Sequence, residues 1–121
     1  MSAPAPNYAH KATFVAPHDG DSFWLRVDFG KLTHGITLDP LFYIRLAGID
    51  CWELSQPLGP KARDFSTNML SKEPIVVQTV KPDLSNLGLE KYGRLLCNVW
   101  VGDDLLSDLL RIAGYEKTSQ P

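Results

Sequence analysis

The stretch VAPHDGDSFWLRVDF, residues 15–29, contains the turn and the strand from which the fold can be worked out. Pro17 ends a short strand, and Asp19-Gly20 favours a hairpin because glycine adopts the positive φ that tight turns need. In the second strand every other residue is apolar, which places four side chains on one face: Phe23, Leu25, Val27 and Phe29. Asp21 has the same parity, so we expect its carboxylate at the inner end of that strand, at the mouth of a barrel.

The chain on either side of this hairpin supplies further elements. Upstream, residues 1–12 are rich in alanine and proline and predict a flexible tail, followed by a first strand over residues 13–16. Downstream, residues 30–40 predict a long hairpin loop, and residues 41–49 predict an apolar strand interrupted by Arg45. Because burying an unpaired guanidinium is costly, Arg45 must reach the barrel mouth or meet an acid or an anion.

Two helices are predicted in the second half of the chain. The first opens at Gly59, where the following proline suits a first helical turn, and stops before Pro74. The last is capped by Asp103 or Asp104 and ends at Gly114, a residue suited to a C-terminal cap. Apolar residues at three- and four-residue spacing define their inner faces: Ala62, Phe65 and Met69 in the first, and Leu105, Leu106, Leu109, Leu110 and Ala113 in the last.

Two more strands complete the pattern. They cover residues 75–80, which are mostly β-branched, and residues 95–101, with a polar loop over residues 82–90 between them. The order is therefore three strands, a helix, two strands and a helix. This order predicts a mainly β fold, a five-stranded Greek-key barrel of the oligonucleotide-binding type (OB fold), in one domain over residues 13–121.

Composition limits the compartment and the partners. The chain has 121 residues, of which 44% are hydrophobic, enough for one core, and no apolar run is long enough to cross a bilayer. The first residues lack the apolar centre of a signal peptide, so we expect a cytoplasmic protein, or a secreted one if the chain is a processed form. Cys51 and Cys97 predict two free thiols. The net charge of -2 predicts few phosphate contacts, because nucleic acid attracts basic surfaces.

One set of polar residues matches the chemistry of phosphodiester hydrolysis. This reaction drives water onto an anion, so a site must neutralise phosphoryl oxygens and accept a proton from water. Carboxylates that bind a hard cation, a carboxylate base and guanidinium forks meet these needs. The chain has such groups in turns or at strand ends: Asp19, Asp21, Arg45, Asp50, Glu53 and Arg94.

Three segments that carry these residues together resemble the staphylococcal nuclease family. They read VAPHDGDS at residues 15–22, RLAGIDCWE at residues 45–53 and KYGRL at residues 91–95. Their order and approximate spacing, with a helix between the second and the third, match the family over residues 13–115. The resemblance implies an oligonucleotide-binding barrel that uses one Ca²⁺ ion to cut phosphodiester bonds in single-stranded or flexible DNA or RNA.

The resemblance also implies a set of calcium ligands. Asp21 and Asp50 would bind Ca²⁺ through their carboxylates, with the backbone carbonyl of Cys51 as a further ligand and Asp19 in support. Where the family usually has Thr-Pro, this chain has Cys51-Trp52, which keeps the backbone carbonyl but loses a hydroxyl and a rigid φ.

The remaining implied roles concern the substrate. Glu53 would be the general base, and Arg45 and Arg94 would stabilise the pentacoordinate phosphorane. Lys91 and Tyr92 would contact a neighbouring phosphate. Together these roles predict a Ca²⁺-dependent endonuclease, a metal-dependent phosphodiesterase.

Other functions and assemblies stay open at this point, among them a structural subunit of a larger particle. A non-catalytic barrel that binds oligonucleotides or protein partners would suit the net charge and the short segment after Gly114, where the family prototype continues into another helix. The leucine stripe of the last helix predicts either core or interface, hence a monomer or a homodimer through that helix. A zinc site is disfavoured, because His10, His18 and His34 fit no ligand spacing with the two cysteines.

Overall fold

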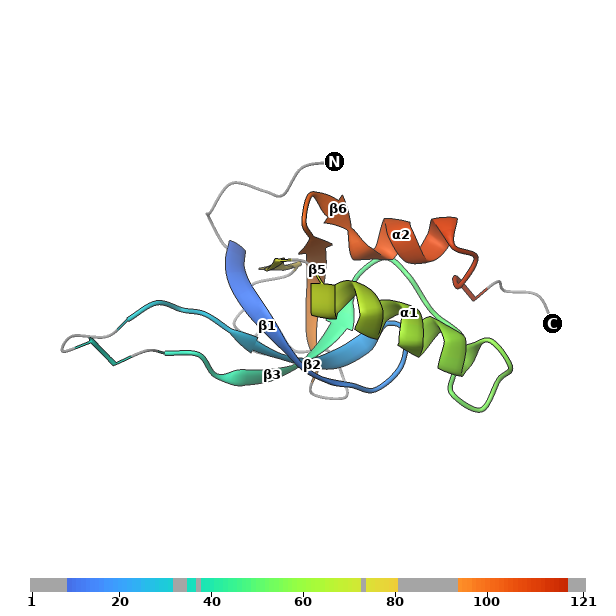
Figure 1. Cartoon of the computed structure of the whole chain (residues 1–121), viewed down its shortest axis with the longest axis horizontal. Coiled ribbons are helices and arrows are strands. Elements are labelled where there is room, and N and C mark those ends of the chain that lie inside the picture. Colours follow the sequence, from blue (N-terminus) through green and yellow to red (C-terminus); the bar gives the residue numbers. More distant parts are fainter. Residues whose placement is uncertain (1–8, 32–34, 37, 73, 81–93, 118–121) are drawn as a thin grey trace.

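Five strands form a closed barrel, and two helices lie on one side of it (Figure 1). The computed structural model describes residues 9–31, 35–36, 38–72, 74–80 and 94–117. The strands are β1 (Ala9–Pro17), β2 (Ser22–Val27), β3 (Leu41–Leu46), β4 (Ile75–Thr79) and β5 (Leu95–Val101). They pair in the order β3-β2-β1-β4-β5, and the parallel pairing of β3 with β5 closes the barrel. The mainly β, five-stranded fold predicted from the sequence is therefore confirmed.

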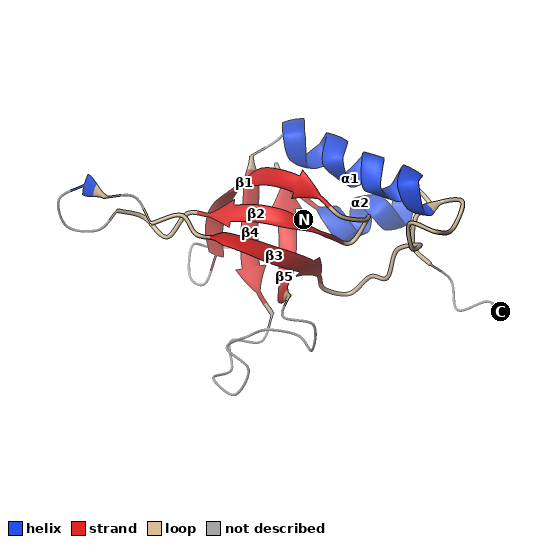
Figure 2. Cartoon of the chain, turned by 90° about the horizontal axis from the view of Figure 1, so that it is seen from below, coloured by secondary structure: helices blue, strands red, loops and turns tan. Residues whose placement is uncertain are grey.

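The helices α1 (Gly59–Lys72) and α2 (Leu106–Ile112) contact each other beside the barrel (Figure 2). α1 also contacts β1, and α2 contacts β5. A two-residue strand, β6 (Asp104–Leu105), pairs with the end of β5 and leads into α2. The inner face of α1 is rotated from the predicted one, and its buried residues are Gly59, Ala62, Ser66 and Leu70. No helix in the described part of the chain is long and apolar enough to span a membrane.

The inner face of β2 follows the predicted alternation almost completely. Phe23, Leu25 and Val27 are buried in the core, and Asp21 at the inner end is only 7% exposed. Phe29 was expected on the same face, but it is 43% exposed because β2 ends two residues earlier, at Val27. The turn before β2 thus brings a carboxylate to the edge of the apolar core.

β1 is longer than predicted. It begins at Ala9 rather than near Thr13, because residues 9–12 pair with β4. Their small and polar side chains give no clear periodic signal, so the sequence does not reveal this backbone pairing. The predicted tail over residues 1–12 is therefore too long by these four residues, and residues 1–8 lie outside the described part of the chain.

The other strands differ less from their predicted bounds. β3 ends at Leu46 rather than at Ile49, and β4 ends at Thr79 rather than at Val80, whereas β5 has the predicted bounds. The predicted polar loop over residues 82–90 lies outside the described residues.

Gly20 is required for close packing rather than for a positive φ, contrary to the prediction. A Cβ atom at Gly20 would lie 2.8 Å from the Cβ of Ala62 and 3.0 Å from that of Cys51. The buried hydroxyl of Ser66 also donates a hydrogen bond of 2.6 Å to the Gly20 carbonyl. Among the described glycines, positive φ occurs elsewhere: at Gly30, Gly35, Gly48, Gly102 and Gly114. Helix α1 therefore packs directly against the β1–β2 turn.

The start of α2 differs from the prediction, whereas its end agrees. The N-cap is Leu105, which makes no side-chain cap hydrogen bond, and Asp104 lies in β6, so the predicted aspartate cap is wrong. Gly114, with φ of 88°, follows the C-cap as predicted. Leu106 and Leu110 are fully buried, so the leucine stripe belongs to the core. The structure thus gives no support to a homodimer through this stripe.

Candidate functional site

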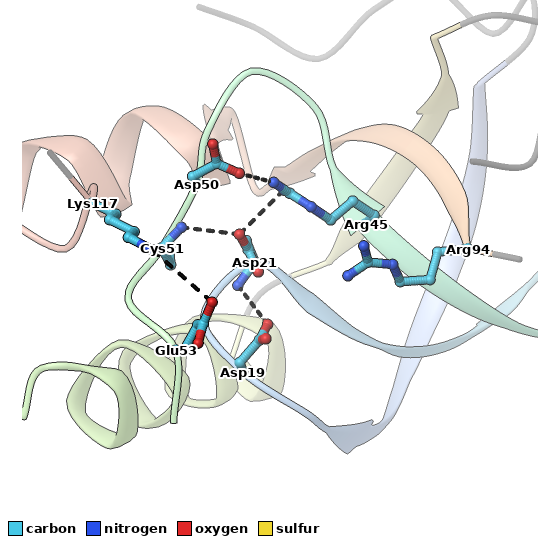
Figure 3. Close-up of a pocket in the computed structure, with 8 residues that line it drawn as sticks. All are labelled: Asp19, Asp21, Arg45, Asp50, Cys51, Glu53, Arg94 and Lys117. Carbon is cyan, nitrogen blue, oxygen red and sulfur yellow. Dashed lines mark hydrogen bonds and ion pairs between the residues drawn. The ribbon is translucent and has the colours of Figure 1, made fainter. Parts of the chain in front are cut away.

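Four parts of the chain meet at one end of the barrel and line a cavity of about 440 Å³ (Figure 3). They are the β1–β2 turn, the end of β3 with the segment that follows it, the residue before β5, and the segment after α2. The lining residues are Asp19, Asp21, Arg45, Asp50, Cys51, Glu53, Arg94 and Lys117. All the described residues that were predicted for the site are among them. Lys91 and Tyr92 lie outside the described residues.

Hydrogen bonds fix the two aspartates of the β1–β2 turn. Asp19 Oδ1 accepts from the backbone N–H of Asp21 (3.2 Å) and from the hydroxyl of Ser22 (2.6 Å). Asp21 Oδ2 accepts from the backbone N–H of Cys51 (2.9 Å). The Asp21 carboxyl thus ties the turn to the segment that follows β3, from a buried position in which its orientation is set by the backbone.

The two carboxyls of this turn differ in proton affinity. Burial raises the pKa of Asp21 to about 7, helped by the neighbouring Asp19 and opposed by the Cys51 N–H and Arg45. Burial also disfavours ionisation of Asp19, but hydrogen bonds from Asp21 and Ser22 outweigh it and lower the pKa of Asp19. Burial thus favours the protonated form of Asp21, whereas the hydrogen bonds around Asp19 favour its ionised form.

Arg45 bridges the buried turn and the segment after β3. Its Nη1 donates to the backbone carbonyls of Leu46 (2.5 Å) and Ile49 (2.7 Å) and lies 3.3 Å from Asp21 Oδ2. Its Nη2 donates to Asp50 Oδ1 in an ion pair. The guanidinium both lines the cavity and meets acids, so the prediction that it would not be buried without a partner is confirmed.

The backbone of Glu53 is held firmly, while its side chain is 71% exposed. Gln56 closes the turn through two hydrogen bonds of 2.9 Å: its Oε1 accepts from the Glu53 N–H, and its own N–H donates to the Glu53 carbonyl. A Cβ atom at Gly59 would lie 1.9 Å from that carbonyl oxygen, so only glycine fits at the start of α1. The carboxylate is therefore open to water on a fixed backbone.

Arg94 reaches the cavity from the barrel side. It immediately precedes β5, and in Figure 3 its guanidinium points toward Asp21 and Arg45. Its Cζ lies 5.9 Å from the ring centroid of Tyr43, a distance typical of a cation–π contact. Two guanidinium groups, from β3 and from the start of β5, thus face one cavity.

Lys117 is a cavity residue that sequence reasoning missed. Its backbone N–H donates to the Asp50 carbonyl (2.6 Å), and its Nζ lies 4.0 Å from Glu53 Oε1. The preceding residue, Glu116, forms a β-bridge with Cys51. A single lysine after the last helix has no local signal, because only the tertiary contact with residues 50–53 brings it to the site.

The model of the family described as staphylococcal nuclease homologue matches residues 43–119, from β3 to the segment after α2. The chain belongs to the staphylococcal nuclease homologue family. The match covers well over half of the chain and includes Arg45, Asp50, Glu53 and Arg94. The family predicted from the three motifs is thereby confirmed. No curated protein gives a significant match to the chain.

Members of the staphylococcal nuclease homologue family typically depend on Ca²⁺. In the described part of this chain, no three histidine, cysteine, aspartate or glutamate side chains converge closely enough to form a metal cluster. The carboxylate oxygens of Asp19, Asp21 and Asp50 are nevertheless the type of ligand that a hard cation such as Ca²⁺ prefers. The Asp50 carboxylate is paired with Arg45, whose guanidinium also lies 3.3 Å from Asp21 Oδ2.

Proposed function

We propose that this chain is a Ca²⁺-dependent endonuclease that hydrolyses phosphodiester bonds in single-stranded or flexible DNA or RNA. The observation that carries the proposal is the convergence of acids and arginines from distant segments on one cavity. The Arg45–Asp50 ion pair alone would not require that a second arginine and the exposed Glu53 carboxylate line the same cavity.

The two arginines would bind the phosphoryl group that is attacked. A guanidinium presents parallel N–H donors that match two phosphate oxygens, and two such forks stabilise the charge of the phosphorane. Arg45 is only 15% exposed and is held by two carbonyls, so its fork is already oriented before substrate arrives. Arg94 faces the same cavity from the β5 side.

Glu53 would take the proton from the attacking water. A general base must be reachable by water and held in position. The exposed side chain of Glu53 meets the first requirement, and the contacts of its backbone with Gln56 and Gly59 meet the second.

The proposed calcium ligands are Asp21, Asp50 and the Cys51 carbonyl, with Asp19 in support. The raised pKa of Asp21 supports this assignment, because burial is its largest cause and a divalent cation would offset the cost of ionising the carboxyl there. When bound, the cation would offset charge on the phosphoryl oxygens. A role for Lys91 and Tyr92 on a neighbouring phosphate rests on the resemblance to the family.

The decisive test combines metal removal with a change at Glu53. The protein is incubated with single-stranded DNA or RNA in Ca²⁺ and in EDTA, and Glu53→Gln is compared with Asp64→Asn, which removes an equally exposed acid from α1. We expect cutting in Ca²⁺ alone, a kcat that is lower by about 10²-fold or more in Glu53→Gln, and an unchanged kcat in Asp64→Asn. Cutting in EDTA would contradict the calcium requirement, and an unaffected Glu53→Gln would remove Glu53 as the base.

A non-catalytic barrel that binds oligonucleotides or proteins is the second candidate. The Arg45–Asp50 ion pair favours it, because this contact already satisfies one proposed ligand without a metal. Titration calorimetry with Ca²⁺ separates the two candidates. The nuclease has a single specific site that is lost in Asp21→Asn, whereas a pure binder has none.

A further inference from the structure

The outer face of β2 and β3 carries a stacked aromatic pair that the core does not need. Trp24 and Tyr43 are direct cross-strand partners, and their rings stack with centroids 4.6 Å apart and an interplanar angle of 11°. Both are half-buried, and neither belongs to the hydrophobic core nor packs against it. His18 adds its ring edge-on to Tyr43, with centroids 5.7 Å apart. We call these three residues the aromatic patch.

The aromatic patch adjoins the cavity. Ser22 and Arg45 form the next cross-strand pair on the same face, since side chains two residues apart on a strand point the same way. Two residues along a strand span about 6.6 Å, comparable with one nucleotide of an extended strand. Arg94 makes the link direct, because its guanidinium contacts the Tyr43 ring while it lines the cavity.

We propose that the aromatic patch stacks a nucleobase of a single-stranded DNA or RNA whose adjoining phosphate enters the cavity. This inference rests on the proposed function and names the part of the substrate that the same site would recognise beyond its phosphate. Bases stack on aromatic side chains with little sequence preference, because every base has a π face. Two arginines that line the cavity beside the patch, Arg45 and Arg94, offer guanidinium donors for the adjoining phosphate, which an apolar protein surface would not use.

The geometry also selects single strands. The faces of a base in a duplex are covered by its neighbours, so only an unstacked base can lie on Trp24 or Tyr43. The aromatic patch would therefore contribute nothing to the binding of an intact duplex.

The test measures binding rather than cutting, in EDTA and at low salt, by fluorescence anisotropy. One probe is an octamer of deoxythymidine, and the other is an abasic octamer with the same number of phosphates. We expect the first to bind the unmodified protein about tenfold more tightly, the order found for one base–aromatic stack. Trp24→Leu and Tyr43→Leu should each lose this preference while keeping their affinity for the abasic octamer.

Phe29→Leu is the matched control, because Phe29 is an exposed aromatic outside the patch. It should keep the preference, and thermal melting should show that all three variants are folded. Equal affinity of the unmodified protein for both octamers would overturn the proposal. So would a preference for the deoxythymidine octamer that persists in each of the single variants, Trp24→Leu and Tyr43→Leu. Because the assay needs no hydrolysis, base stacking without any cutting would refute the proposed nuclease but not the aromatic patch.

Discussion

The two halves of the site are held in different ways. The β1–β2 turn, with Asp19 and Asp21, is clamped by buried contacts: Ser66 binds the Gly20 carbonyl, and the Leu46 N–H donates to the Asp21 carbonyl (2.8 Å). We call this the buried half. Residues 50–53, the exposed half, have side chains that are 77% exposed at Asp50 and 71% exposed at Glu53.

This difference has a physical meaning for the proposed nuclease. The buried half depends on packing of the core and α1, so it should be as stable as the whole domain. Cys51 anchors the exposed half to the core and to Asp21, but its other members depend on backbone contacts with Gln56 and with the surface residues 116–117. Local opening usually begins where few apolar contacts are buried, so the exposed half is expected to open first.

The largest effect is expected from Arg45→Met, because Arg45 contacts both halves. Loss of one preorganised charge donor typically lowers kcat by about 10²- to 10³-fold. The Leu46 and Ile49 carbonyls also lose their donor, so the melting temperature should fall. Kinetics and thermal melting are compared with Arg63→Met, an arginine of α1 outside the cavity, which should change neither. A kcat that stays near the original value would show that Arg45 is structural only.

A smaller effect, confined to the exposed half, is expected from Gly59→Ala. The new methyl group would overlap the Glu53 carbonyl, and a displacement of about 1 Å at a catalytic group can cost up to 10²-fold in rate. We expect kcat to fall by about tenfold or more and calcium affinity to fall less, because the overlap is with Glu53 and Leu54 and not with the proposed calcium ligands. Ser55→Ala in the same segment is the control. Equal losses of kcat and calcium affinity would mean that the two halves move as one.

The buried half should make calcium binding depend on pH. Asp21 has a pKa of about 7 instead of the ordinary 3.8, so the folded protein holds a proton that Ca²⁺ must displace. Affinity should therefore rise by up to about tenfold per pH unit from pH 5 to 7 and level off above. The same raised pKa makes the contribution of Asp21 to metal-free stability fall as pH rises from about 4 to 7. Calorimetry at several pH values checks the affinity, and a flat profile below pH 7 would count against Asp21 as a ligand.

The smallest effect is expected from Lys117→Met. The ion pair with Glu53 spans 4.0 Å between well-exposed groups, and such pairs contribute about 1 kcal/mol at most, so kcat should change by less than about fivefold. Lys117→Pro removes the backbone N–H that binds the Asp50 carbonyl and should cost more. Lys61→Met on α1 controls for the lost charge. If Lys117→Met were the more harmful change, the lysine side chain would have a direct role with substrate.

Features set by local periodicity could be predicted from the sequence. The alternation of Phe23, Leu25 and Val27 reflects burial on one side of a strand, and its parity correctly brought Asp21 to the edge of the core. The bounds of β5 and the extent of α1 followed from similarly local patterns. The family motifs also predicted that the acids and arginines of three distant segments belong to one site, and these residues line one cavity.

Features set by tertiary contact could not be predicted in this way. The need for glycine at position 20 comes from α1, whose Ala62 lies against the turn. Lys117 reaches the site through pairing between segments more than 60 residues apart. Phe29 was misplaced because alternation does not show where a strand leaves the barrel.

The parallel pairing of β3 with β5 has a consequence for how the protein is made. Arg45 pairs with Leu96 across this seam, and Arg94 lies just before it, so closing the barrel is the step that brings both guanidinium groups together. Contacts between segments so distant in the chain form late in folding. In a chain whose β5 has not yet left the ribosome, Arg45 therefore has no Arg94 beside it, and the proposed site is completed only when β5 closes the barrel.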